Sequence, residues 1–110
     1  MMNIKFSGFN ENTLTFEYTG TLSAGDLVKM SASAKVVKAT ANGEFIGVCT
    51  GVRNGYAAVQ TAGYVEFKKS GTVNVGYNKL VAASDAVKTA ETGIDRLVIY
   101  VDDTTVGFIL

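Results

Sequence analysis

Side chains able to do chemistry are few in this chain. The sequence contains no histidine, no tryptophan and a single cysteine, Cys49. A cysteine nucleophile needs a base or cation that favours its thiolate, and no histidine can supply one. Zinc sites need several Cys or His ligands, which one cysteine cannot provide. We therefore expect Cys49 to be a buried core residue, and we predict no catalytic residue, no metal site and no cofactor.

Acidic residues are the remaining candidates for acid–base or metal chemistry. Asp102-Asp103 lacks the alternating acidic ladder of a calcium loop, so we expect a hairpin turn there. Further carboxylates offer a pair for glycoside hydrolysis if they converge in space, namely Glu17, Asp26, Glu44 and Glu66. Each of them also fits the solvent side or the end of a strand, where charged side chains usually lie. A small hydrolase is therefore the weaker hypothesis.

Glycine and tyrosine residues raise two binding functions. The segments 43–47 and 51–55 lack the lysine and Ser/Thr of a phosphate loop. Tyrosines can stack on bases or sugars, and the candidates are Tyr56, Tyr64, Tyr77 and Tyr100. The 10 basic and 10 acidic residues cancel and are scattered, whereas nucleic-acid binding draws its affinity from clustered Lys and Arg. We expect no nucleic-acid partner; a β-barrel module that binds sugar or nucleic acid is kept as an alternative.

Length and composition indicate one globular domain. The chain has 110 residues, of which 47% are hydrophobic, enough for a core without disulfides. Its longest apolar run, residues 97–101, is too short to cross a bilayer, and no signal-peptide pattern is present. We expect synthesis in the cytoplasm and no membrane partner.

Strand and turn signals recur along the whole chain. Strict alternation over residues 13–19 predicts a strand whose buried face carries Leu14, Phe16 and Tyr18. Asn42-Gly43 and Asn54-Gly55 predict hairpin turns on either side of a strand over residues 44–52, with a bulge at its glycines. Further strands are expected over residues 57–60, 64–67, 72–75, 96–101 and 105–110. The segments 31–41 and 82–90 allow at most short helical turns.

This pattern predicts an all-β fold, a small single-domain β-barrel or sandwich built from short antiparallel strands and hairpins. We divide the chain into an N-terminal hairpin or arm, residues 1–20, and a barrel-like core, residues 21–110. The core contains a weak internal repeat. The first copy consists of Gly25, Leu27, Val28, Ser31, Val37, Lys38 and Gly43, and the second of Gly76, Leu80, Val81, Ser84, Val87, Lys88 and Gly93.

Short motifs in this core resemble the tailed-phage capsid cement, or head decoration, proteins. The matching segments are Ala24-Gly25-Asp26-Leu27-Val28, Val37-Lys38-Ala39, Gly43-Glu44-Phe45-Ile46-Gly47-Val48 and Gly63-Tyr64-Val65. A second strand start of this kind, Gly76-Tyr77-Asn78-Lys79-Leu80-Val81, lacks the aspartate of the family pattern. The N-terminal hairpin has no counterpart in the family. The departures leave open another phage head or tail component.

The resemblance implies a non-enzymatic phage or prophage virion protein. Such a protein is made in the bacterial cytoplasm, lies on the capsid surface, binds the major capsid protein and stabilises the shell. It also implies a homo-oligomer, with a trimer as the working form.

Apolar residues outside the expected core predict the contact surface. Ile4, Phe6 and Phe9 lie near a chain end, where water-exposed apolar side chains are costly. Leu97 and Ile99 belong to a strand with no polar face, which is buried on both sides or used in a subunit contact. We expect these five residues to contact the shell or a second subunit.

Overall fold

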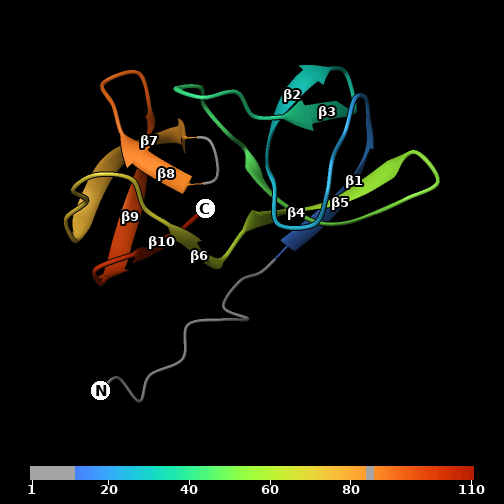
Figure 1. Ribbon diagram of the computed structural model, residues 1–110. Coiled ribbons are helices and arrows are strands. Elements are labelled where there is room, and N and C mark those ends of the chain that lie inside the picture. The colour runs from blue at the N-terminus through green and yellow to red at the C-terminus, as the bar shows by residue number, and fades with distance from the viewer. Residues whose placement is uncertain (1–11, 84–85) are drawn as a thin grey trace.

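The computed structural model describes residues 12–83 and 86–110. Every regular element in these residues is a strand, so the predicted all-β class is confirmed. Within them there is no helix that is long and apolar enough to span a membrane. The strands are β1 (Asn12–Tyr18), β2 (Leu27–Ala32), β3 (Lys35–Lys38), β4 (Gly47–Arg53), β5 (Tyr56–Ala62), β6 (Tyr64–Lys68), β7 (Gly76–Ala83), β8 (Ala86–Thr89), β9 (Ile94–Val101) and β10 (Thr105–Ile109), shown in Figure 1.

Strands β1 to β5 close into a barrel with the order β1-β3-β2-β4-β5. All pairs are antiparallel except β1 and β3, which are parallel. We call residues 12–62 the first half. Strand β1 lies in the segment 1–20 predicted as an N-terminal hairpin or arm beside the core, but it completes this barrel by pairing with both β3 and β5.

Strands β6 to β10, residues 64–110, form the second half and repeat this order as β6-β10-β9-β7-β8. The two edges of this sheet meet at a parallel bridge between Lys69 and Val87. That bridge corresponds to the parallel β1–β3 pair, in which Tyr18 meets Val36. The halves lie side by side in Figure 1, blue to green on the right and yellow to red on the left.

The match between the halves extends to single residues. Gly20 and Gly25 follow β1 with φ of 77° and 96°, and Gly71 and Gly76, the latter the first residue of β7, follow β6 with φ of 77° and 102°. These positive φ values explain why glycine occupies all these positions. The internal repeat is therefore longer than the sequence pattern indicated and includes β1 and β6.

A bulge recurs at one position in both halves. Cys49 pairs with Val59, and the register shifts by one extra residue, Thr50, before the next pair. Val98 pairs with Phe108, and the shift again comes one residue later, at Ile99. Extra residues of this kind increase local twist, which a small barrel needs in order to close. The predicted bulge in β4 is confirmed, and its recurrence in β9 fixes the correspondence of the halves.

Each half has its own core, and corresponding positions fill both. In the first half the buried residues are Leu22, Val28, Val36, Cys49, Ala57 and Val59. In the second half they include Val73, Leu80, Val87, Val98, Val106 and Phe108. The sequence pattern had aligned Val37 with Val87, whereas the strand pairing aligns fully buried Val36 with Val87.

Several sequence expectations are wrong in detail. Leu14 is 52% exposed, whereas its strand neighbours Phe16 and Tyr18 are partly buried and pack against the first core. Residues 72–75 form no strand, because Val73 leaves the sheet to fill the core between two positive-φ glycines. Residues 44–46 precede β4 instead of belonging to it.

Of the two predicted hairpin turns, one is confirmed. Asn54 and Gly55 have φ of 52° and 83° and connect the paired strands β4 and β5. Asn42-Gly43 connects β3 to β4, which do not pair with each other, because β2 lies between them. The connection instead runs toward the second half.

Candidate functional site

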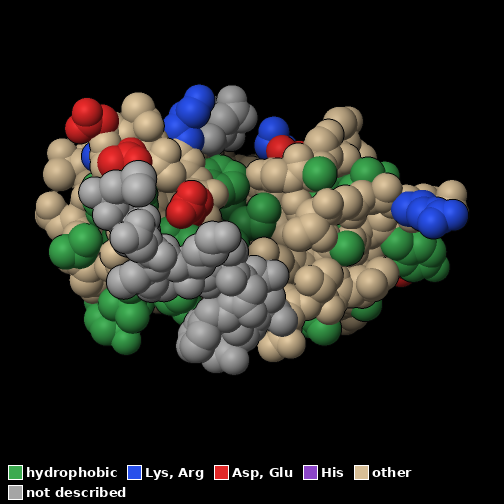
Figure 2. Space-filling model, turned by 90° about the horizontal axis from the view of Figure 1, so that it is seen from below, with side chains coloured by type: hydrophobic (Ala, Val, Ile, Leu, Met, Phe, Trp, Pro, Cys, Tyr) green, Lys and Arg blue, Asp and Glu red, His purple; other side chains and the backbone are tan. Residues whose placement is uncertain are grey.

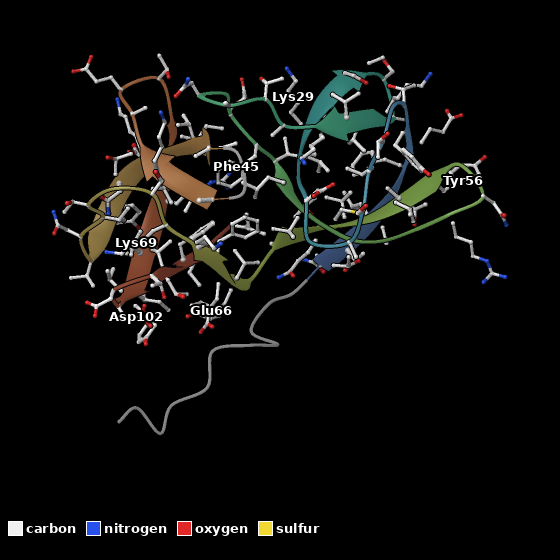
Figure 3. The ribbon with its side chains drawn as sticks, viewed as in Figure 1. Lys29, Phe45, Tyr56, Glu66, Lys69 and Asp102 are labelled. Atoms are coloured by element: carbon white, nitrogen blue, oxygen red, sulfur yellow. The ribbon has the colours of Figure 1, made fainter. Side chains whose placement is uncertain are left out.

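The most elaborate site in the described residues is the joint between the two halves. Phe45, in the connection from β3 to β4, belongs to the core of the second half and is 1% exposed. Its ring meets Phe108 edge-on, with 6.0 Å between centroids. Ile46, the next residue, packs on the first core instead. Successive side chains of an extended chain point in opposite directions, so this segment supplies one residue to each core. Figure 3 shows Phe45 between the halves.

Polar contacts hold the same segment in place. The Asn42 amide donates to the Ala82 carbonyl, and the Ala82 amide donates to the Gly43 carbonyl, both at 2.8 Å. The Arg96 guanidinium donates to the Phe45 carbonyl at 2.7 Å and lies 5.0 Å from the centre of the Phe45 ring. Burial lowers the pKa of Arg96, but arginine remains protonated in proteins. The joint is thus a strand addition with an aromatic plug, not a reactive site.

The outer face of β2 and β4 completes the joint. Leu27 pairs with Val48 across these strands, and both pack on the core of the second half. A crevice of about 70 Å³ beside them is lined by Gly25, Asp26, Leu27, Lys38, Ala39, Phe67, Ala82 and Ala83. Its only charged groups, Asp26 and Lys38, form an ion pair with Nζ 3.8 Å from Oδ1. The crevice has room for little more than water.

Cys49 is buried, as expected. Its side chain is 1% exposed in the first core, and burial raises the pKa of its thiol, with a further increase from the Asp26 carboxylate. A raised pKa keeps the group a thiol, which is a poor nucleophile and a poor metal ligand. Among the described residues no three Cys, Asp or Glu side chains lie close enough to hold a metal ion.

The candidate carboxylates have separate surroundings. Asp26 accepts from the Ser23 amide at 2.9 Å and pairs with Lys38, while Glu66 accepts from the Tyr64 hydroxyl at 2.8 Å. Glu44 borders a different depression, with Lys29 and Met30. Asp26 and Glu44 thus border different depressions, and Glu66 is bonded to a tyrosine of the second half.

Asp102 forms the hairpin turn predicted for it. Its Oδ1 accepts from the amides of Thr104 and Thr105, at 2.9 and 2.8 Å, and its Oδ2 accepts from the Tyr100 hydroxyl at 2.7 Å. These hydrogen bonds, first that of Tyr100, lower the pKa of Asp102. The same bond raises the pKa of Tyr100. The group organises the β9–β10 turn.

The tyrosines do not gather in one groove. Tyr64 is buried, its ring lies over Gly107, and burial followed by its bond to Glu66 raises its pKa. Tyr56 and Tyr77 are exposed but border separate open depressions, one on each half. Figure 3 places Tyr56 at the far end of the first half.

The predicted contact residues fall into two groups. Ile4, Phe6 and Phe9 lie outside the described residues. Leu97 and Ile99 flank Val98, whose side chain faces the core, and both are partly exposed. Val75 and Tyr77, 67% and 76% exposed, were not predicted as contact residues, although Tyr77 was a candidate for stacking; Tyr77 pairs directly with Leu97.

We call Val75, Tyr77, Leu97 and Ile99 the outer patch. Leu97 also pairs with Ile109 on β10, so apolar side chains continue across the outside of the sheet. Figure 2 shows apolar side chains at the end of the molecule formed by the second half. Alternation in β7 could have indicated Tyr77, but nothing in the sequence says that its face remains uncovered.

Comparison with known proteins adds no relative: no protein-family model and no curated protein matches this chain.

Proposed function

We propose that this protein is a non-enzymatic structural protein of a phage or prophage virion that decorates and stabilises the capsid surface. The observation that carries the proposal is the outer patch, an apolar surface on a β-sheet in which Val75 and Tyr77 are exposed and Leu97 and Ile99 partly exposed. Apolar patches of this kind, bordered by polar residues, are typical of protein–protein contacts.

The motifs that resemble cement proteins have structural roles that support this proposal. Gly25 and Asp26 lie directly before β2, and the segment 43–48 forms part of the joint between the halves. Gly63, with φ of 94°, leads into β6. A cement protein needs such a rigid scaffold more than it needs reactive groups, since its task is to hold shell subunits together.

Co-sedimentation with capsids tests the proposal. Purified protein is mixed with empty capsids of the parent phage, and bound protein is measured against concentration. Saturable binding with a fixed number of copies per capsid, and a higher temperature of capsid disruption, are the expected results. A folded protein that stays in the supernatant at every concentration would contradict the proposal.

A truncated protein locates the contact. A version lacking residues 1–9 removes Ile4, Phe6 and Phe9, and Tyr56→Asp serves as a matched surface control on the first half. We expect truncation to weaken capsid binding and the control to leave it unchanged. Equal binding by the truncated and intact proteins would remove the N-terminal residues from the contact.

A further inference from the structure

The joint between the halves has an inserting side and a receiving side. The inserting side belongs to the first half and contains the cross-strand pair Leu27–Val48. The receiving side belongs to the second half and contains Val65, Phe67 and Ala82; of these, Phe67 and Ala82 line the crevice beside Leu27. Because the halves repeat one topology, each surface has a counterpart in the other half.

The counterpart of the inserting side is the outer patch. In the first half Gly25 bonds to Cys49, and the next pair along the strands is Leu27–Val48. In the second half Gly76 pairs with Val98, and the next pair is Tyr77–Leu97. Asp26 is an extra residue, since Cys49 exchanges backbone hydrogen bonds with both Gly25 and Asp26. Tyr77 and Leu97 therefore occupy the positions that Leu27 and Val48 use for packing, but nothing in the described residues covers Tyr77.

The counterpart of the receiving side is equally uncovered. Leu14 corresponds to Val65, since Leu14 pairs with Val59 on β5 and Val65 pairs with Phe108 on β10. Phe16 corresponds to Phe67 in the same way, through their partners Ala57 and Val106. Ala82 pairs with Val87 as Met30 pairs with Val36. Val65 and Ala82 are 8% and 2% exposed, whereas Leu14 and Met30 are 52% and 43% exposed.

We infer that copies of this chain assemble head to tail: the outer patch of one copy packs on the surface formed by Leu14, Phe16 and Met30 of the next. This contact would continue between molecules the packing that already joins the two halves within one. The two surfaces differ, so the contact is heterologous and produces a closed ring or an open filament. Head-to-tail assembly follows from the halves themselves, whether or not the protein binds a capsid.

The contact between copies lacks one part of the internal joint. The connection from β8 to β9 is a turn over residues 90–93, shorter than the segment 39–46 that carries Phe45. No aromatic plug therefore enters the next copy from this turn. We expect an assembly that dissociates on dilution, while each chain stays folded.

Two variants that each block one surface test the arrangement. Leu14→Asp blocks the receiving surface and Tyr77→Asp blocks the outer patch; both side chains are more than half exposed, so the fold should tolerate them. Tyr56→Asp is the matched control, because Tyr56 is as exposed as Leu14 and lies outside both surfaces. Mass is measured by light scattering over a range of protein concentrations, and folding is checked by circular dichroism.

We expect the unaltered chain and the Tyr56→Asp control to assemble, and each blocking variant alone to be monomeric. An equal mixture of the two blocking variants should form dimers and nothing larger, because one intact surface of each kind remains. A monomeric unaltered chain, blocking variants that still assemble, or a mixture that stays monomeric would each overturn the inference.

Discussion

Leu14 in the barrel and Val65 in the second sheet occupy corresponding positions in the same strand order, yet Leu14 is 52% exposed and Val65 only 8%. Val65 shares its core with Phe45, which the first half inserts, while no described segment performs this task for Leu14. Duplicated topology thus provides two equal surfaces and a single internal contact, which covers one of them. The difference teaches that position in a sheet and burial are separate properties: the first follows from pairing and the second from neighbours.

The outer faces of the halves also differ in composition. Tyr64, Ile99 and Tyr100 on the second half correspond to Thr13, Thr50 and Gly51 on the first. Small side chains leave a shallow depression in the first half, whereas the second half presents tyrosines hydrogen-bonded to Glu66 and Asp102. Figure 3 shows these two carboxylates near the same edge of the second half.

The largest expected effect comes from removing Phe45, which fills the core of the second half and has no counterpart in the first. Phe45→Ala deletes a fully buried ring and its contacts with Phe108 and Arg96. Replacements of this kind cost about 3–5 kcal/mol of unfolding free energy. Chemical denaturation measures it, with Tyr56→Ala as an exposed aromatic control expected within about 0.5 kcal/mol of the unaltered chain. Equal effects of both substitutions would show that the joint adds nothing to stability.

A double substitution replaces Gly107 and Tyr64 of the second half with the residue types found at the corresponding positions of the first half. A methyl group at Gly107 would collide with the Tyr64 ring, and the corresponding residues in the first half are Ala58 and Thr13. Gly107→Ala alone should cost about 1–3 kcal/mol through overpacking. Combined with Tyr64→Thr, its cost should fall by about 1 kcal/mol or more, because the clash is gone. Strictly additive denaturation results would contradict this explanation of the glycine.

Cys49 and Val98 occupy corresponding core positions. Substitution of Cys49 should have a smaller effect on stability than the changes above. Cys49→Ala removes one buried atom, so we expect a loss of roughly 1 kcal/mol and unchanged assembly or capsid binding. Cys49→Val, which copies the second half, is the matched variant. Loss of binding by a Cys49→Ala protein of native stability would show that the thiol has a function.

The smallest effect distinguishes the two hairpin tips. Asp102 has a pKa below its ordinary value of 3.8, so the unfolded chain binds this proton more readily than the folded one. Its stabilising contribution is present above that ordinary pKa and disappears as pH falls through the lower folded pKa. The stability difference between the unaltered chain and Asp102→Asn should therefore shrink as the pH is lowered from about 5 to about 2. Thermal unfolding of both proteins at each pH measures this difference. Arg53→Gln, at the tip of the first half, should show no such dependence in this range.

Local signals in the sequence predicted much of the fold. Alternation predicted β1, the Asn54-Gly55 pair predicted its hairpin, and the acidic pair after β9 predicted a turn. These features depend on a few neighbouring residues, which the sequence displays directly. The candidate site was harder to predict. Leu97 was named as a contact residue from its apolar strand, but Tyr77 only as a tyrosine that could stack on a base or sugar, since the sequence does not display the pairing of Tyr77 with Leu97.

By itself, the sequence determined that this protein is built from strands, that a pattern recurs along it, and that it carries few groups for catalysis. Only the tertiary structure decided that the recurring pattern is a pair of complete five-strand units, and that Phe45 and Ile46 enter different cores. The reason is physical. Alternation assigns successive side chains to opposite faces of a strand, but what packs against each face depends on residues brought there by the folded chain.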